Sequence, residues 1–293
     1  MKTIAVLTDF SKTAENATIY ALHLAEHLQA NIKLYHSFST PSINPLGIQM
    51  VWPRENGVDW KADNMRQLEQ LVDELKKEVS TTTATHFKLK IAYECYDADF
   101  ATFLKMLELD QSNTVMLVLG SHEKSGLSWL TGNHVNEVMD HATLPLLVIS
   151  ENQRFVKINK IAFATDLSTT DIAQIHSLTS LASAFKAIIL LTHIADESTD
   201  ESKLQLKVDS LLKQVTAKAN YANVYYRGVK KDDIIDGLNW MIENGQIEML
   251  VLVHRHKSFF KDLFNSSISK KMAVTNDVPL LIYPAQNSCL PVF

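Results

Sequence analysis

The amino-acid sequence predicts an α/β protein made of two tandem, doubly wound, five-stranded parallel sheets with helices on both faces. Three observations support this prediction. Short apolar runs alternate with longer amphipathic segments, which is the pattern of strands and helices around a parallel sheet. The pattern occurs twice in 293 residues, a length that suits two domains. The two halves also share sequence, because IAVLTD at 4–9 is matched by IAFATD at 161–166.

The shared sequence extends over two blocks. The first block begins at Ile4 and Ile161, an offset of 157 residues (161 − 4), and continues without a gap to His36 and His193. The second block matches MLVLG with LVLVH at an offset of 134 residues (250 − 116), which aligns Gly120 with His254, and LPLLVI with VPLLIY at the same offset. Two blocks that match in the same order indicate an internal duplication.

The two offsets differ, so the first half must carry an insertion between the matched blocks. Residues 38–59 contain three prolines and two glycines and are predicted to form part of it as a loop. The predicted domains are residues 1–151 and 156–293, joined by a polar segment.

In the first half, the predicted strands are short and apolar, as expected for strands buried between two layers of helices. They cover residues 3–9, 31–37, 87–95, 114–120 and 144–150. Ser11 is a suitable N-cap for a helix that places Leu24 and Leu28 on one face. The remaining predicted helices are 60–79, a helix opened by Asp97 and Asp99, and 132–142.

The second half repeats this order. Its predicted strands are 160–166, 187–193, 223–229, 248–254 and 279–283. Its predicted helices lie near 169–186, 201–217, 232–244 and 265–275.

Composition narrows the classes of function. The net charge of −5 disfavours a nucleic-acid partner, because binding to phosphate backbones needs a basic surface. Two cysteines, Cys95 and Cys289, provide no disulfide framework and fit a reducing compartment. No apolar run approaches the roughly 18 residues typical of a membrane span. A cytoplasmic protein without a membrane segment is therefore predicted.

Ligands of doubly wound sheets bind beyond the carboxyl ends of the strands, where the strand order switches. The residues predicted to follow those ends are Asp9, Ser37 and Gly120 in the first half, and Asp166, Ile194 and His254 in the second. Four features around them are similar to the universal stress protein family: TDFS after the first strand, L-x-H ending the second, a glycine-containing loop after the fourth, and LPLLVI.

This resemblance implies five parallel strands per domain and association of domains through their fifth strands. It also implies that ATP is a ligand of many members and that others bind none. In ATP-binding members, the aspartate at the place of Asp9 and Asp166 contacts adenine and ribose. A backbone position at the place of Ser37 and Ile194 touches adenine, and a loop patterned G-x2-G-x9-G-[ST] holds the phosphates.

Both loops depart from that pattern. The first keeps Gly120 and Ser121 but has Glu123 at the second glycine, and the spacing to Gly132 is one residue short. The resulting candidates for nucleotide binding are Asp9, Ser37, Gly120, Ser121, Gly132, Asn133 and His134. The second loop contains no glycine, which leaves a degenerate set of Asp166, Ile194, His254, Ser266 and Ser267.

Several residues have two interpretations on sequence alone. Asp9 and Asp166 either contact a nucleotide or cap a turn at a strand end. Glu123 repels phosphate, shares a Mg²⁺ ion with it, or points into solvent. His36 and His193 are interpreted as structural, each bonded to nearby backbone.

The leading hypothesis is a non-enzymatic, regulatory stress-response protein whose first domain binds ATP, with Mg²⁺, weakly or not at all. No Walker lysine or nucleophile–base pair is present, and no metal site is predicted. A slow nucleotide hydrolase that uses His122 or Glu123, and a carrier of another small ligand, stay open. The apolar fifth strands are expected to pair with each other, because each would otherwise be an exposed edge. Whether the chain also forms a homodimer is left open.

Overall fold

A computed structural model of the chain describes the residues 1–39, 59–82, 87–109, 113–121, 138–139, 143–196, 198–254, 278–284 and 290–293. Its strands are β1 (Thr3–Leu7), β2 (Asn31–Phe38), β3 (Ile91–Asp97), β4 (Thr114–Ser121), β5 (Leu146–Ser150), β6 (Lys160–Ala164), β7 (Ile188–Ala195), β8 (Val224–Lys230), β9 (Met249–His254) and β10 (Leu280–Pro284). Its helices are α1 (Lys12–Leu28), α2 (Trp60–Thr82), α3 (Phe100–Leu109), the 3₁₀ turn η2 (Thr169–Asp171), α5 (Ile172–Phe185), α6 (Glu201–Lys218) and α7 (Ile234–Gly245).

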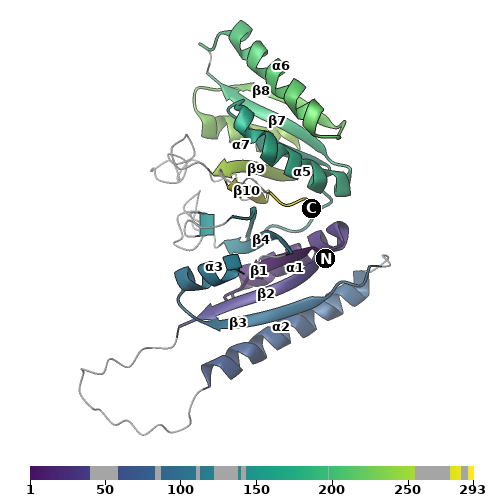
Figure 1. The fold of residues 1–293 in the computed structure, drawn as a ribbon, viewed down its shortest axis with the longest axis vertical. Helices are drawn as coiled ribbons and strands as arrows, with labels where there is room; N and C mark the ends of the chain where they lie inside the picture. The colour runs from purple at the N-terminus through teal and green to yellow at the C-terminus, as the bar shows by residue number, and fades with distance from the viewer. Residues whose placement is uncertain are drawn as a thin grey trace, which may run out of the picture.

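The ten strands form one continuous sheet in the order β3-β2-β1-β4-β5-β10-β9-β6-β7-β8 (Figure 1). The order 3-2-1-4-5 therefore occurs twice, as a doubly wound sheet requires. Every neighbouring pair is parallel except β5 and β10, which are antiparallel and join the halves through Leu146–Val148 and Leu280–Ile282. The α/β class and the predicted pairing of the fifth strands are confirmed, and the exact limits of the two domains stay a prediction.

Helices cover both faces of the sheet and enclose two apolar layers. One layer holds side chains from α1, α2, α5 and α6, together with alternate strand residues such as Ile4 and Ile161. The other holds side chains from α3 and α7, together with the intervening strand residues such as Ala5 and Ala162. The alternation follows from the two-residue repeat of a strand, whose side chains point to opposite faces.

The third strand of the first half differs from its prediction. Residues 87–95 were expected to be extended, whereas β3 begins at Ile91, which pairs with Ile32, and ends at Asp97. Strand pairing with β2 sets these limits, because the pairs end with Phe38 opposite Asp97. Asp99, and not Asp97, opens α3 by accepting the backbone N–H of Thr102 at 3.0 Å.

The register of the sheet corrects the alignment of the fourth strands. Ile4 pairs with Met116, and its counterpart Ile161 pairs with Met249, so these strands match at an offset of 133 residues (249 − 116). The buried faces agree with this offset, since Val118 and Val251 belong to the same layer as Ile4 and Ile161. The alignment of Gly120 with His254 is therefore wrong by one residue.

The corrected register places Val253 at the position of Gly120 and His254 at the position of Ser121. The fifth strands keep the predicted offset of 134, because Leu146 lies beside Leu117 and Leu280 beside Leu250.

A polar cluster holds the connection between the halves against α1. Asn16 is buried, and its side-chain amide donates to the backbone carbonyls of Ser150 at 2.9 Å and Gln153 at 2.8 Å. Arg154 donates to the Asn16 side-chain oxygen, and the side-chain oxygen of Gln153 accepts the Ser150 N–H at 3.0 Å. Asn16 therefore fixes the path of the chain where it leaves β5.

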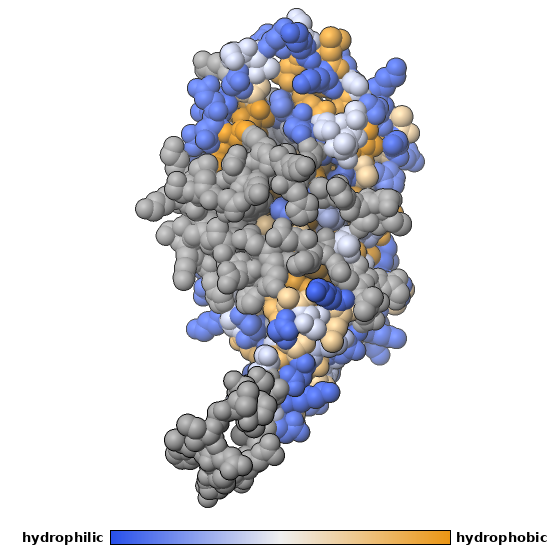
Figure 2. All heavy atoms as spheres, turned by 60° about the vertical axis from the view of Figure 1, so that its left-hand side comes forward, coloured by the Kyte–Doolittle hydropathy of each residue, from blue (hydrophilic) through white to orange (hydrophobic). Residues whose placement is uncertain are grey.

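Hydrophilic side chains make up much of the described surface of both halves, and apolar side chains lie among them (Figure 2). Among the described residues, no helix is both long enough and apolar enough to span a membrane.

Candidate functional site

The same turn follows the first strand of each half. After β1, the hydroxyl oxygen of Thr8 accepts the N–H of Phe10 at 3.1 Å, and a carboxylate oxygen of Asp9 accepts the N–H of Ser11 at 3.0 Å. Phe10 takes a left-handed conformation with φ of 62°. The Ser11 hydroxyl then caps α1 by accepting the N–H of Ala14 at 3.2 Å.

After β6, the corresponding residues repeat this arrangement. The hydroxyl oxygen of Thr165 accepts the N–H of Leu167 at 2.9 Å, and Asp166 accepts the N–H of Ser168 at 2.9 Å. Leu167 has φ of 64°, and Ser168 accepts the N–H of Thr170 at 3.2 Å. Both aspartates therefore hold a strand-end turn, which is one of their two interpretations, and their side chains are exposed at the carboxyl ends of the strands, so contact with a nucleotide stays a prediction.

The two strand-ending histidines brace these turns. Nδ1 of His36 lies 2.8 Å from the carbonyl oxygen of Thr8, and Nδ1 of His193 lies 2.9 Å from that of Thr165. Since a carbonyl oxygen only accepts, Nδ1 carries the hydrogen, and Nε2 is the acceptor of the neutral ring. The structural interpretation of both histidines is confirmed.

Gly120 brings β4 into close contact with the start of α1. A Cβ atom on Gly120 would lie 2.7 Å from the carbonyl carbon and oxygen of Thr13 and 2.8 Å from the nitrogen of Ala14. Real side chains essentially never approach backbone atoms so closely, so glycine is required there by packing as well as by any ligand.

Next to Gly120, Ser121 is buried at the end of β4, with 3% of its surface exposed. Its hydroxyl has no hydrogen-bond partner among the described residues. A buried hydroxyl of this kind is expected to be satisfied by a partner, such as a ligand or a water molecule.

The described candidates of the first half thus lie at the ends of three neighbouring strands: Asp9 follows β1, Ser37 lies at the end of β2, and Gly120 and Ser121 end β4. Of these strands, β1 lies between β2 and β4. The other first-half candidates lie outside the described residues: Gly132, Asn133 and His134, together with His122 and Glu123.

The second half differs at the matching positions. Val253 is buried where the first half has Gly120, and Asp171, with 1% of its surface exposed, is found where it has Ala14. Asp171 accepts a hydrogen bond of 2.7 Å from the Thr165 hydroxyl and ends the 3₁₀ turn η2, which precedes α5. The second half therefore has larger side chains at these two positions, and its helix α5 begins after a 3₁₀ turn, whereas α1 begins directly after Ser11.

The remaining second-half candidates are Ile194, His254, Ser266 and Ser267. Ile194 packs against α7, because a Cβ atom on Gly237 would lie 2.6 Å from its Cγ1. His254 is half-buried at the end of β9. Ser266 and Ser267 lie outside the described residues.

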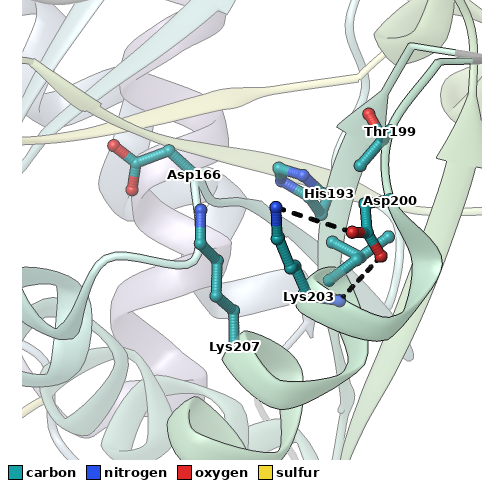
Figure 3. A pocket seen from close by; sticks show the side chains of 7 residues that line it. Asp166, His193, Thr199, Asp200, Lys203 and Lys207 are labelled. Atoms are coloured by element: carbon teal, nitrogen blue, oxygen red, sulfur yellow. Dashed lines mark hydrogen bonds and ion pairs between the residues drawn. The ribbon is translucent and has the colours of Figure 1, made fainter.

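A pocket of about 200 Å³ lies between the ends of β6 and β7 and the first turns of α6 (Figure 3). It is lined by Asp166, His193, Thr199, Asp200, Lys203, Leu204 and Lys207. Lys203 and Lys207 extend from α6 toward the strand ends, where Asp166 and His193 are located. The two lysines belong to no motif, and their only signal in the sequence is a spacing of four residues on a predicted helix.

Over the described ranges, no three or more His, Cys, Asp or Glu side chains gather closely enough to hold an ion.

Comparison with known proteins adds the following. The model of the universal stress protein family matches residues 1–150. A universal stress protein from Archaeoglobus fulgidus DSM 4304 has a similar fold, with a TM-score of 0.63, 12% identity and 96% of each chain covered.

A putative universal stress protein from Pseudomonas aeruginosa UCBPP-PA14 is also similar in fold, with a TM-score of 0.59 and 11% identity over 97% of this chain and 93% of that one. No curated protein matches the chain. At such low identity the solved structures establish the fold alone.

Proposed function

Because the chain belongs to the universal stress protein family, we propose that it is a non-enzymatic, ligand-binding regulator of the stress response. The proposed place of action is the cytoplasm, which the low cysteine content of the chain supports. Its proposed ligand is an adenine nucleotide, ATP with Mg²⁺, held by the first half.

The observation that carries this proposal is the arrangement at the ends of β1 and β4. Asp9 is exposed beside the strand at which the sheet order switches, where ligands of such folds bind. Gly120 lets the end of β4 lie close to the start of α1 there, and the buried Ser121 hydroxyl has no partner among the described residues. An acidic acceptor for sugar or base donors and a phosphate-binding backbone segment would thus lie on adjacent strands.

The proposed affinity is low. The sequence after Ser121 lacks one glycine of the family pattern and is one residue short, so fewer backbone N–H groups can align with phosphate. We expect a dissociation constant no tighter than tens of micromolar, which corresponds to roughly 6 kcal/mol of binding free energy.

The second half is proposed not to bind ATP. Val253 and Asp171 occupy the region where the first half has only Gly120 and the methyl group of Ala14. A carboxyl group beside a phosphate is unfavourable, since two negative charges about 4 Å apart cost roughly 4 kcal/mol at an effective dielectric constant near 20.

Calorimetric titration of the whole chain with ATP and Mg²⁺ tests this proposal. Asp9→Ala is expected to abolish measurable binding, and the matched variant Asp166→Ala is expected to leave it unchanged. Asp9→Asn removes the negative charge but keeps the turn, because an asparagine oxygen can still accept the Ser11 N–H. Two ATP sites per chain, or binding that depends on Asp166 and not on Asp9, would refute the assignment.

A further inference from the structure

The pocket beside α6 has unused positive charge. Lys203 lies 3.6 Å from the Asp200 carboxylate, which also accepts the backbone N–H groups of Ser202 and Lys203 as the cap of α6. Lys207, one turn farther along, makes no hydrogen bond or ion pair within the described part of the chain. Its side chain extends toward Asp166 (Figure 3). An ammonium group at the wall of a pocket favours an anionic ligand.

Two further polar groups reach the same pocket. His193 presents its Nε2 nitrogen as an acceptor in the neutral ring, since Nδ1 is used by Thr165. Asp166 also lines the pocket, close to the end of the Lys207 side chain. The Asp166 carboxylate and the Nε2 atom can accept from a donor such as a hydroxyl group, so the pocket offers acceptors as well as ammonium groups.

The lysine pair has no counterpart in the first half. The corresponding helix of the first half, α2, contains no two lysines that are four residues apart. The lysines are thus a feature of the second half alone.

The size of the pocket limits the ligand. A volume of about 200 Å³ is below the roughly 300–1,000 Å³ of pockets that enclose drug-sized molecules. It equals the liquid volume of about six or seven water molecules, at about 30 Å³ each. A compound of a few carbon atoms fits within this volume.

We propose that the second half binds a small hydroxylated anion in this pocket. The anionic group, a phosphate or a carboxylate, is held by Lys203 and Lys207. A hydroxyl group of the same molecule donates to Asp166 or His193. This site is independent of the nucleotide site proposed for the first half, and it gives the second half a role other than support.

Calorimetry on the whole chain at low ionic strength, with glycerol 3-phosphate, L-malate and inorganic phosphate as separate probes, tests this site. At least one of the two hydroxylated probes is expected to bind with a stoichiometry of one. Lys207→Gln is expected to weaken that binding at least tenfold. Lys213→Gln is the matched control, because it removes the same charge from an exposed position of α6 outside the pocket.

Three further comparisons sharpen the result. Lys207→Arg keeps the charge and is expected to retain binding. Asp166→Ala is expected to weaken binding of the hydroxylated probe more than binding of inorganic phosphate, because inorganic phosphate has no hydroxyl-bearing carbon to place beside Asp166. Asp9→Ala is expected to leave all three titrations unchanged, so failure of the nucleotide proposal does not affect this one.

The proposal is overturned if none of the three probes binds, or if Lys207→Gln and Lys213→Gln weaken binding equally, which would indicate attraction to net charge only. Tight binding of inorganic phosphate with no gain from a hydroxyl group would also overturn the stated ligand class. The relative affinities of glycerol 3-phosphate and L-malate identify which anionic group the lysines select.

Discussion

Substituting Gly120 with alanine tests the close packing of β4 on α1. The new Cβ atom would lie 2.7 Å from two backbone atoms of Thr13 and 2.8 Å from one of Ala14, and backbone atoms cannot rotate away. Overpacking of this kind costs about 1–3 kcal/mol. Replacing glycine also restricts the unfolded chain, which returns about 0.4–1 kcal/mol. The steric term is larger, so we expect a net loss of about 1–2 kcal/mol.

Urea denaturation followed by circular dichroism measures this loss. Gly228→Ala is the control, because its Cβ atom would lie 3.1 Å from the hydroxyl oxygen of Tyr226, at the end of a side chain that can move. That variant is expected to stay within about 0.5 kcal/mol of the parent protein. If Gly120→Ala is as stable as the parent, or loses no more than Gly228→Ala, the glycine is not required by this contact.

Two further predictions concern the junction of the halves. Asn16→Ala removes the two hydrogen bonds that its amide donates to the carbonyls of Ser150 and Gln153, each worth about 0.5–1.5 kcal/mol, so urea denaturation should show a loss of about 1–3 kcal/mol; an unchanged midpoint would contradict the described contacts. A chain limited to residues 1–151 leaves the buried edge of β5 without β10, so light scattering should detect dimers or larger species; a stable monomer would show that this edge needs no partner.

The order of strands and helices could be predicted because each buried strand is a short apolar run between amphipathic helices. The contact of β5 with β10 could be predicted from the apolar character of two edge strands together with the family resemblance, and the structure adds that it is antiparallel. The register of β4 and β9 was less accessible. The sequences of these two strands match at offsets of both 134 and 133 residues. Only the pairing of β4 with Ile4 and of β9 with Ile161 decides between the two offsets.

The positions of the strand-end turns could be predicted from the sequence, but the hydrogen bonds that hold them could not. No structural role was predicted for Thr8 and Thr165, although their hydroxyl and carbonyl groups bond to both the turn and the neighbouring histidine. In the pocket of the second half, the strand-end position of Asp166 could be predicted, but the contribution of the two lysines could not. Lys207 is far from Asp166 in sequence, and packing of α6 against the sheet brings them to one cavity.

We propose that the two halves of the chain hold different ligands, with adenine nucleotide confined to the first half. Photolabelling of the whole chain with 8-azido-ATP and Mg²⁺, followed by peptide mapping, tests it most directly. Labelled peptides should come only from residues 1–151, and excess ATP and the Asp9→Ala variant should both suppress them. Specific labelling of peptides from residues 156–293 would contradict the claim.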